Sequence, residues 1–439
     1  MTVTVITGGT VLGPDPVGPH RATRHEVDVA VDDITGLIVA VGPDLTGDRT
    51  LDAAGCLVAS GLVDLHAHLR QPGREAVETI ETGSRAAALG GYTAVVAMAD
   101  TDPPVDHAAV VSEVLALAKG ALCRVHPAAA LTVGRAGAAL APMAELADLG
   151  VTVFSDAGRA VQDPAVARRA LDYLAGVAAV RGVPLVAAQP CLVEALAAGG
   201  VVHEGAVSSR LGLAGQPAEA EELAVGRDIA LAGLTGARVH LQGVSTALSV
   251  DLIRRAKAAG VAVTAETTPH HLVLTDEACA GYDTATKVSP PLRPAADVEA
   301  VRAAVADGTV DAVATDHGPQ SPDLTDRPFD QAPFGTIGLE TALAVVLGEA
   351  GLTPEQALAA LSWRPAVIAG LVDEHGGPVA PGRAANLVVI DPDHRWRCDP
   401  ARGASRSTNS IFAGRELRGW ARHTVYRGEP VVVDHRATR

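Results

Sequence analysis

His66 and His68 stand two residues apart at the end of the apolar run Gly61 to Leu65. If the run is a β-strand, residues i and i+2 point to one face, so both imidazoles can reach the same metal ion. Imidazole is a good ligand for zinc. Two neighbouring histidines also occur by coincidence, so the pair alone does not establish a metal site.

Two aspartates follow later apolar runs in the same way. Asp156 lies in Phe154-Ser155-Asp156-Ala157-Gly158, and Asp316 in Ala314-Thr315-Asp316-His317-Gly318. At the carboxyl ends of parallel strands, where barrel active sites lie, they would complete a four-ligand shell with the two histidines. Either aspartate taken singly fits a helix N-cap or a turn equally well. Their joint placement with the histidine pair favours a metal site.

The elements that must position these residues alternate between short apolar runs and Ala-rich amphipathic stretches. The predicted strands are 61–65, 93–97, 151–154, 184–187, 239–241, 261–265 and 312–314. The predicted helices include 77–89, 164–180, 218–234, 247–258 and 297–306. About eight such units predict an α/β fold with a (β/α)₈ barrel of the TIM type.

Both ends of the chain have a different pattern, in which short β-branched runs are separated by Gly, Pro and Asp. The runs 2–6, 27–31 and 37–41 lie near the start, and 384–390 and 424–433 near the end. We therefore expect residues 1–56 and 372–439 to form one small β-domain beside a barrel over 57–371.

Composition excludes several classes of function. Acidic residues outnumber basic ones 51 to 35, giving a net charge of -16 without a basic stripe, which argues against a nucleic-acid partner. The five cysteines show no CxxC spacing and indicate free thiols in a reducing compartment. No apolar run reaches the roughly 18 residues of a membrane helix, and the start has no signal-peptide pattern. We expect a cytoplasmic protein with no membrane partner.

The stretch GLVDLHAHLRQPGREAVETIETGSRAAALGG, residues 61–91, closely resembles the opening signature of the larger bacterial dihydroorotases of the amidohydrolase superfamily. Further matching stretches lie at 266–274, 287–293, 315–317, 334–341 and 409–414. The resemblance extends nearly from end to end.

This resemblance implies a barrel with a flanking β-domain and the reversible hydrolysis of dihydroorotate to N-carbamoyl-aspartate, a step of pyrimidine biosynthesis. It assigns metal binding, with Zn²⁺ as the expected ion, to His66, His68, Asp156 and Asp316. Asp316 is also expected to be the catalytic proton acceptor and donor for the attacking water. Arg70 is retained for a substrate carboxylate, for which a guanidinium is a natural bidentate partner.

Other positions depart from the family pattern. The second-metal histidines fall on Gln189 and Gly243, so we expect a single zinc ion and a lost second site, with His240 as a packed or supporting residue. Phe334 and Gly335 are retained in the substrate pocket. The substituted substrate-binding positions are Asp100, Ser289 and Gln320. Asp100 would repel an anionic substrate, so we expect weakened dihydroorotate binding.

Three hypotheses follow for function. The first is a single-metal dihydroorotase-like enzyme, expected to be a homo-oligomer. The second is a non-catalytic subunit that supports an aspartate transcarbamoylase assembly. The third is hydrolysis of a different cyclic amide, such as a hydantoin. Families of that third kind use a bridging lysine, but Lys119, Lys257 and Lys287 do not stand at a suitable strand end.

Overall fold

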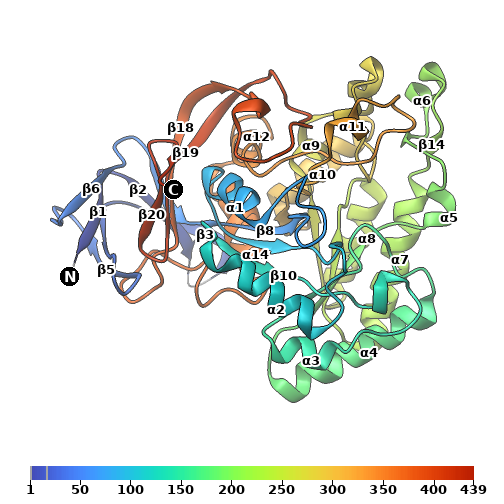
Figure 1. Cartoon of the computed structure of the whole chain (residues 1–439), viewed down its shortest axis with the longest axis horizontal. Coiled ribbons are helices and arrows are strands. Elements are labelled where there is room, and N and C mark those ends of the chain that lie inside the picture. Colours follow the sequence, from blue (N-terminus) through green and yellow to red (C-terminus); the bar gives the residue numbers. More distant parts are fainter. Residues whose placement is uncertain (1, 16–17) are drawn as a thin grey trace.

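The computed structural model describes residues 2–15 and 18–439; residues 1, 16 and 17 of the expected β-domain lie outside the described part. Strands from both ends of the chain, blue and red in Figure 1, gather in one lobe that also holds both termini. The long helices of the green and yellow middle of the chain form the other lobe.

The strand lobe contains two sheets, one with the order β21-β20-β19-β18-β7-β2-β3 and one with the order β5-β4-β1-β6. Its strands are β1 (Val3–Thr7), β2 (Thr10–Asp15), β3 (Gly18–Glu26), β4 (Asp28–Asp32), β5 (Leu37–Gly42), β6 (Arg49–Asp52), β7 (Leu57–Ser60), β18 (Leu387–Arg397), β19 (Glu416–Tyr426), β20 (Glu429–Val433) and β21 (Arg436–Ala437). β7 pairs antiparallel with β18, with Leu387 opposite Ser60. The two ends of the chain therefore share one sheet.

The other lobe is built on parallel strands. They are β8 (Leu62–Ala67), β9 (Tyr92–Ala97), β10 (Arg124–Pro127), β11 (Val153–Phe154), β12 (Val186–Pro190), β15 (Val239–Gln242), β16 (Val263–Thr267) and β17 (Ala312–Val313). They form one sheet of order β10-β9-β8 and one of order β11-β12-β15-β16-β17. Parallel bridges from Ala129 to Phe154 and from Ala67 to His317 join the edges of the two sheets. A two-stranded unit, β13 (Val202–His203) and β14 (Gly215–Gln216), lies outside these sheets.

Helices follow most of the parallel strands. They are α1 (Ile80–Leu89), α2 (Ala108–Leu117), α3 (Met143–Asp148), α4 (Pro164–Arg181), α5 (Glu194–Ala197), α6 (Ala206–Leu211), α7 (Glu219–Thr235), α8 (Ala247–Ala258), α9 (Pro269–Val273), α10 (Ala295–Asp307), α11 (Pro322–Thr325), α12 (Ala342–Gly348), α13 (Pro354–Leu358) and α14 (Arg364–Ile368). α4 shows why such segments are helical: Asp163 caps its first turn, Pro164 occupies the first position, and Gly182 ends it in the left-handed conformation.

Two apolar clusters hold the parallel sheets in place. The larger cluster packs outward-facing strand residues against the helices. The second is built from small aliphatic side chains of both sheets, including Val63, Val96 and Val186, together with Ala369 and Leu371 near α14. Because β8 and β17 contribute to the second cluster just before His66 and Asp316, this packing fixes where those two residues emerge.

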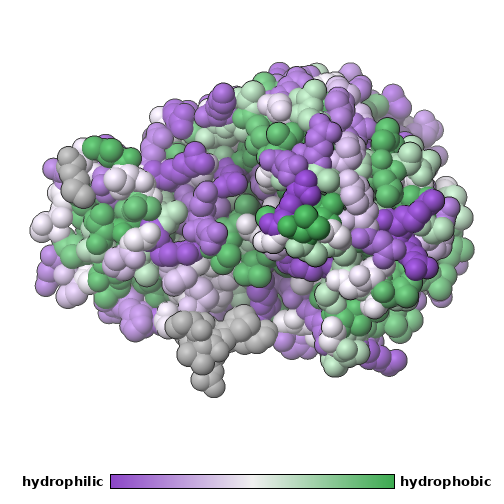
Figure 2. Space-filling model, turned by 90° about the horizontal axis from the view of Figure 1, so that it is seen from below, coloured by the Kyte–Doolittle hydropathy of each residue, from purple (hydrophilic) through white to green (hydrophobic). Residues whose placement is uncertain are grey.

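Hydrophobic and hydrophilic residues are interspersed on the face of the molecule seen in Figure 2, without one continuous apolar band. Among the described residues, no helix has both the length and the apolar character needed to cross a membrane.

Candidate metal centre

A cavity of about 680 Å³ opens where the parallel strands end. This volume lies in the range of small-molecule sites. The predicted site residues that line it are His66, His68, Arg70, Asp100, Ser289, Asp316, Phe334 and Gly335. These residues come from segments as far apart in the sequence as His66 and Gly335. The parallel strands bring them together at the edge where the strands end.

His66, His68 and Asp316 form a compact group of candidate metal ligands. One ligand atom from each lies within 4.8 Å of the other two. The Oδ1 atom of Asp316 is 3.6 Å from Nε2 of His66 and 3.4 Å from Nε2 of His68. Nε2 of His66 is buried and has no hydrogen-bond partner among the described residues. A buried, unpaired ring nitrogen beside a carboxylate is what a divalent cation would satisfy.

Glu266, near the end of β16, contacts the ring nitrogen of His66 that faces away from Asp316. Its Oε1 atom lies 2.8 Å from Nδ1 of His66, and its Oε2 atom lies 3.0 Å from Nε2 of His240. Burial lowers the pKa of His66, but Asp316 and Glu266 outweigh it and raise that pKa to about 9. A carboxylate on Nδ1 turns Nε2 toward the cavity, which is the arrangement typical of metal-binding histidines.

Asp100 holds His68 in the same way. Its Oδ1 atom is 2.8 Å from Nδ1 of His68, while Nη1 of Arg70 donates to its Oδ2 atom at 2.6 Å. Burial raises the pKa of Asp100, but His68 and Arg70 outweigh it and hold that pKa well below its usual range. The side chains of all three residues are almost fully buried. The guanidinium that was predicted to bind a substrate carboxylate therefore already has a carboxylate partner.

Asp316 is positioned by the residues on either side of it. The carboxylate of Asp64 on β8 accepts from the backbone nitrogen of Thr315 at 2.8 Å, which ties the strand end to its neighbour. Asp316 itself has a positive φ of 47°, a sparsely populated backbone conformation. Burial raises the pKa of Asp316, but the two histidines outweigh it and lower that pKa to about 2.

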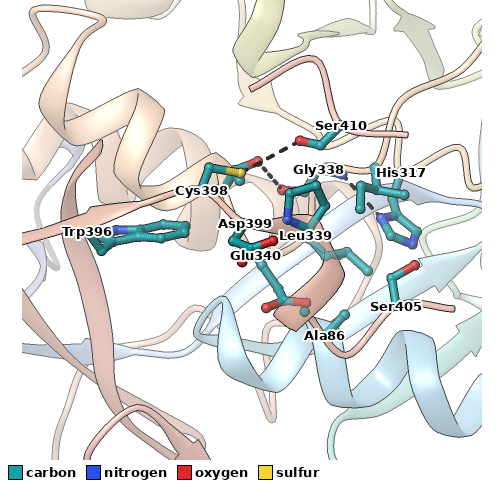
Figure 3. Close-up of a pocket in the computed structure, with 14 residues that line it drawn as sticks. Ala86, His317, Gly338, Leu339, Glu340, Trp396, Cys398, Asp399, Ser405 and Ser410 are labelled. Carbon is teal, nitrogen blue, oxygen red and sulfur yellow. Dashed lines mark hydrogen bonds between the residues drawn. The ribbon is translucent and has the colours of Figure 1, made fainter. Parts of the chain in front are cut away.

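His317 connects this strand end to a second, smaller pocket, shown in Figure 3. Its Nδ1 accepts from the backbone nitrogen of Gly338 at 3.2 Å, and its Nε2 lies 3.4 Å from a carboxylate oxygen of Glu78. The fully buried His317 thereby anchors the loop that carries Asp316.

Asp156, the fourth predicted ligand, is not part of the compact group. Its Oδ1 atom accepts from the backbone nitrogens of Leu131 at 2.8 Å and Thr132 at 3.0 Å, and its Oδ2 atom accepts from the Thr132 hydroxyl. Both carboxylate oxygens are thus used to join two neighbouring strand ends. Asp156 is also not among the described residues that line the cavity.

Gln189 and Gly243 lie at the ends of β12 and β15. Both amide atoms of Gln189 are buried without a hydrogen-bond partner among the described residues. Gly243 has a φ of 69°, and a Cβ atom there would lie 3.0 Å from Pro290. Gln320 is not among the described cavity-lining residues; its side-chain amide donates to the Phe334 carbonyl at 2.8 Å.

Two functional candidates escaped the sequence interpretation. Glu266 follows a predicted apolar strand, as Asp156 and Asp316 do, and that signal could have found it. Lys287 lines the cavity, with its amino group donating to the carbonyls of Asp330 and Ala332 and lying 4.9 Å from the Phe334 ring centre. Its position on an irregular segment gave no strand signal.

Comparisons with known proteins agree with this architecture. A family model described as "Dihydro-orotase-like" matches residues 55–249. The chain is 48% identical to "Dihydroorotase" of Pelotomaculum thermopropionicum, with 98% of each chain covered. It is 46% identical to "Dihydroorotase" of Streptomyces coelicolor, with 100% of each chain covered.

Solved structures with the same fold include an L-hydantoinase (dihydropyrimidinase) from Arthrobacter aurescens. That structure has a TM-score of 0.88 at 23% identity, with 100% of this chain and 98% of the other covered. A dihydropyrimidinase from Brevibacillus agri follows with a TM-score of 0.83 at 23% identity, covering 99% and 96%. Identity above 40% over the whole length carries more weight than fold likeness alone, and the chain belongs to the dihydroorotase family.

Proposed function

We propose that this chain is a cyclic amidohydrolase that reversibly hydrolyses dihydroorotate to N-carbamoyl-aspartate in pyrimidine biosynthesis. The observation that carries the proposal is the group of His66, His68 and Asp316 in one cavity with Arg70. The full-length similarity to proteins named dihydroorotase supports this reaction.

The proposed metal is one zinc ion held by His66, His68 and Asp316. Two imidazoles and one carboxylate are a known ligand set of catalytic zinc sites, which keep a further position open. The unpaired Nε2 of His66 supports this assignment. Asp156 is left out of the proposed set because, among the described residues, it belongs neither to the compact ligand group nor to the cavity lining. When bound, such an ion would polarise the ring carbonyl and lower the pKa of water beside it.

The chain's own residues then supply proton transfer and binding. Asp316 is ionised at neutral pH and can accept the proton of the attacking water. The water oxygen bonds to the ring carbonyl carbon, the ring C–N bond breaks, and Asp316 returns the proton to the departing nitrogen. Arg70 faces the cavity as the guanidinium for the substrate carboxylate, in competition with Asp100.

We further propose that the two parallel sheets make up one eight-stranded (β/α)₈ barrel over residues 57–371. The bridges at Ala67 and Ala129 join both pairs of sheet edges, which supports closure. Residues 1–56 and 372–439 are then the two parts of a single β-domain. β7 (Leu57–Ser60), at the start of the proposed barrel range, belongs to the seven-stranded sheet of that domain.

Association and location stay predictions. We expect a homo-oligomer, which size-exclusion chromatography with light scattering would test. Binding to aspartate transcarbamoylase can be tested by mixing the two proteins in the same experiment. Cytoplasmic location is inferred from the five cysteines, which are all free and buried.

The decisive experiment is hydrolysis of dihydroorotate by zinc-loaded protein, with zinc content measured on the same sample. Asp316→Asn is expected to lower the rate by about 10²–10⁴-fold, because it removes the proton acceptor. Asp228→Asn is a matched control, since Asp228 is a buried carboxylate paired with Arg227 and is not a cavity-lining residue. Bound zinc without turnover would point to a different ring substrate. The absence of both bound zinc and turnover would favour the non-catalytic hypothesis.

A further inference from the structure

Asp100 follows β9 in the sequence and lies between the candidate metal ligand His68 and the substrate-binding Arg70. Each of its carboxylate oxygens contacts a different one of these residues, at 2.8 Å and 2.6 Å. Its side chain is only 12% exposed, and it lines the same cavity as the proposed zinc ligands. One carboxylate therefore serves both the metal-binding part and the substrate-binding part of the site.

For a metal ion to bind Nε2 of His68, the ring proton must stand on Nδ1, and in that tautomer only a residue with two acceptor oxygens can make both contacts. An ionised carboxylate accepts on both oxygens, whereas an amide has one acceptor oxygen and an NH₂ group that donates. With asparagine at this position, either His68 or Arg70 would lose its partner, or the ring proton of His68 would move to Nε2, which then could not bind a metal ion. The guanidinium would then be free to bind a substrate carboxylate, or the imidazole would lose its orientation.

We propose that Asp100 is a specificity-determining residue that orients His68 for metal binding and occupies Arg70, so that the site discriminates only weakly in favour of carboxylated rings. To bind the guanidinium of Arg70, a substrate carboxylate must either share it with Asp100 or displace the Asp100 carboxylate from it. The same negative charge repels the incoming carboxylate. This inference rests on one part of the proposed function, namely that a cyclic amide occupies the cavity, and not on the hydrolysis of dihydroorotate itself.

The first test compares two ligands that differ in one carboxylate. Binding of orotate and of uracil to the zinc-loaded full-length protein is measured by titration calorimetry for the wild type, Asp100→Asn and the control Asp228→Asn. We expect the ratio of orotate to uracil affinity to rise about tenfold in Asp100→Asn and to stay unchanged in the control. An unchanged or lower ratio in Asp100→Asn would overturn the proposal.

The second test measures zinc affinity by competition with a chelator. Asp100→Ala is expected to weaken zinc binding about 10–100-fold, as for other residues that orient a histidine ligand, and Asp100→Asn to weaken it less. Unaltered zinc affinity in Asp100→Ala would refute the orienting role. Neither readout requires turnover, so a shifted ligand ratio in a protein that does not hydrolyse dihydroorotate would refute the proposed function and leave this inference standing.

Discussion

Buried histidines at the two ends of the parallel strands have pKa values shifted in opposite directions. His66 stands near the end of β8, whereas His126 and His375 bond to Thr152 and Thr93 where β11 and β9 begin. Burial lowers the pKa of all three. The pKa of His126 and of His375 falls to about 3, but Asp316 and Glu266 raise that of His66 to about 9.

The difference lies in the partners. At the strand beginnings each imidazole contacts a threonine hydroxyl, and burial together with the positive charge of Arg124 keeps it neutral. At the strand ends the partners are carboxylates, which favour a cation on or beside the imidazole. The same residue type is thus structural at one end of the sheets and a candidate ligand at the other, and neighbours rather than burial decide which.

The largest expected effect is the response to zinc. At a free zinc concentration 1,000 times the dissociation constant, binding should raise the free energy of unfolding by about 4 kcal/mol. Chemical denaturation with zinc and with a chelator measures this difference. His66→Gln should abolish it, whereas His126→Gln should leave it intact. A full zinc response in His66→Gln would show that the ion binds elsewhere.

Removing the carboxylate that supports His66 should make it resemble the histidines at the other end. Glu266→Gln deprives both His66 and His240 of their charged partner, so zinc affinity should fall about 10–100-fold, or about 1.4–2.8 kcal/mol. Chelator competition measures this loss. Glu340→Gln is the control, because Glu340 is a carboxylate of the second pocket in Figure 3. Equal losses in both variants would contradict a specific role for Glu266.

The lowered pKa of His126 should make the free energy of unfolding depend on pH. The folded pKa of His126 is about 3, below the value of about 6.5 expected for the unfolded chain. Between these values the unfolded state binds the extra proton, so stability is complete above pH 6.5 and is lost as pH falls toward 3. From pH 6.5 to 5 this histidine alone should cost roughly 1.5 kcal/mol.

Urea denaturation of wild type and His126→Gln at both pH values tests this prediction. The variant should lose less stability than the wild type on acidification. Identical losses would mean that His126 takes up its proton in the folded state as well.

Several elements could be predicted because their signals are local. α8 was predicted over Ala247–Ala258 and found there, since Thr246 caps it and its apolar positions follow the helical period. β10 was not predicted, because Arg124–Pro127 is short and polar and depends on its pairing with β9. The predicted strand 424–433 is two strands, β19 and β20, joined by a turn at Arg427 and Gly428.

The site was only partly predictable for the same reason. The spacing of His66 and His68 is local, and a strand is enough to place them together. The contact of Asp156 with Leu131 and Thr132 joins residues about 25 positions apart, which no local pattern specifies. Contacts between distant segments thus decide which of several strand-end carboxylates can face a metal.

The smallest expected effect concerns Thr152, at the strand-beginning end. Its hydroxyl lies 2.7 Å from Nε2 of His126 and donates to the Ala369 carbonyl at 2.6 Å, so it joins a strand to the segment after α14. Thr152→Val keeps the shape but leaves both buried groups unpaired, which should lower the free energy of unfolding by about 1 kcal/mol. Thr152→Ser should restore most of this, as urea denaturation can measure. The histidines at the other end keep their carboxylate partners in Thr152→Val, so zinc affinity should stay unchanged. A tenfold change in zinc affinity would show that the two ends are coupled.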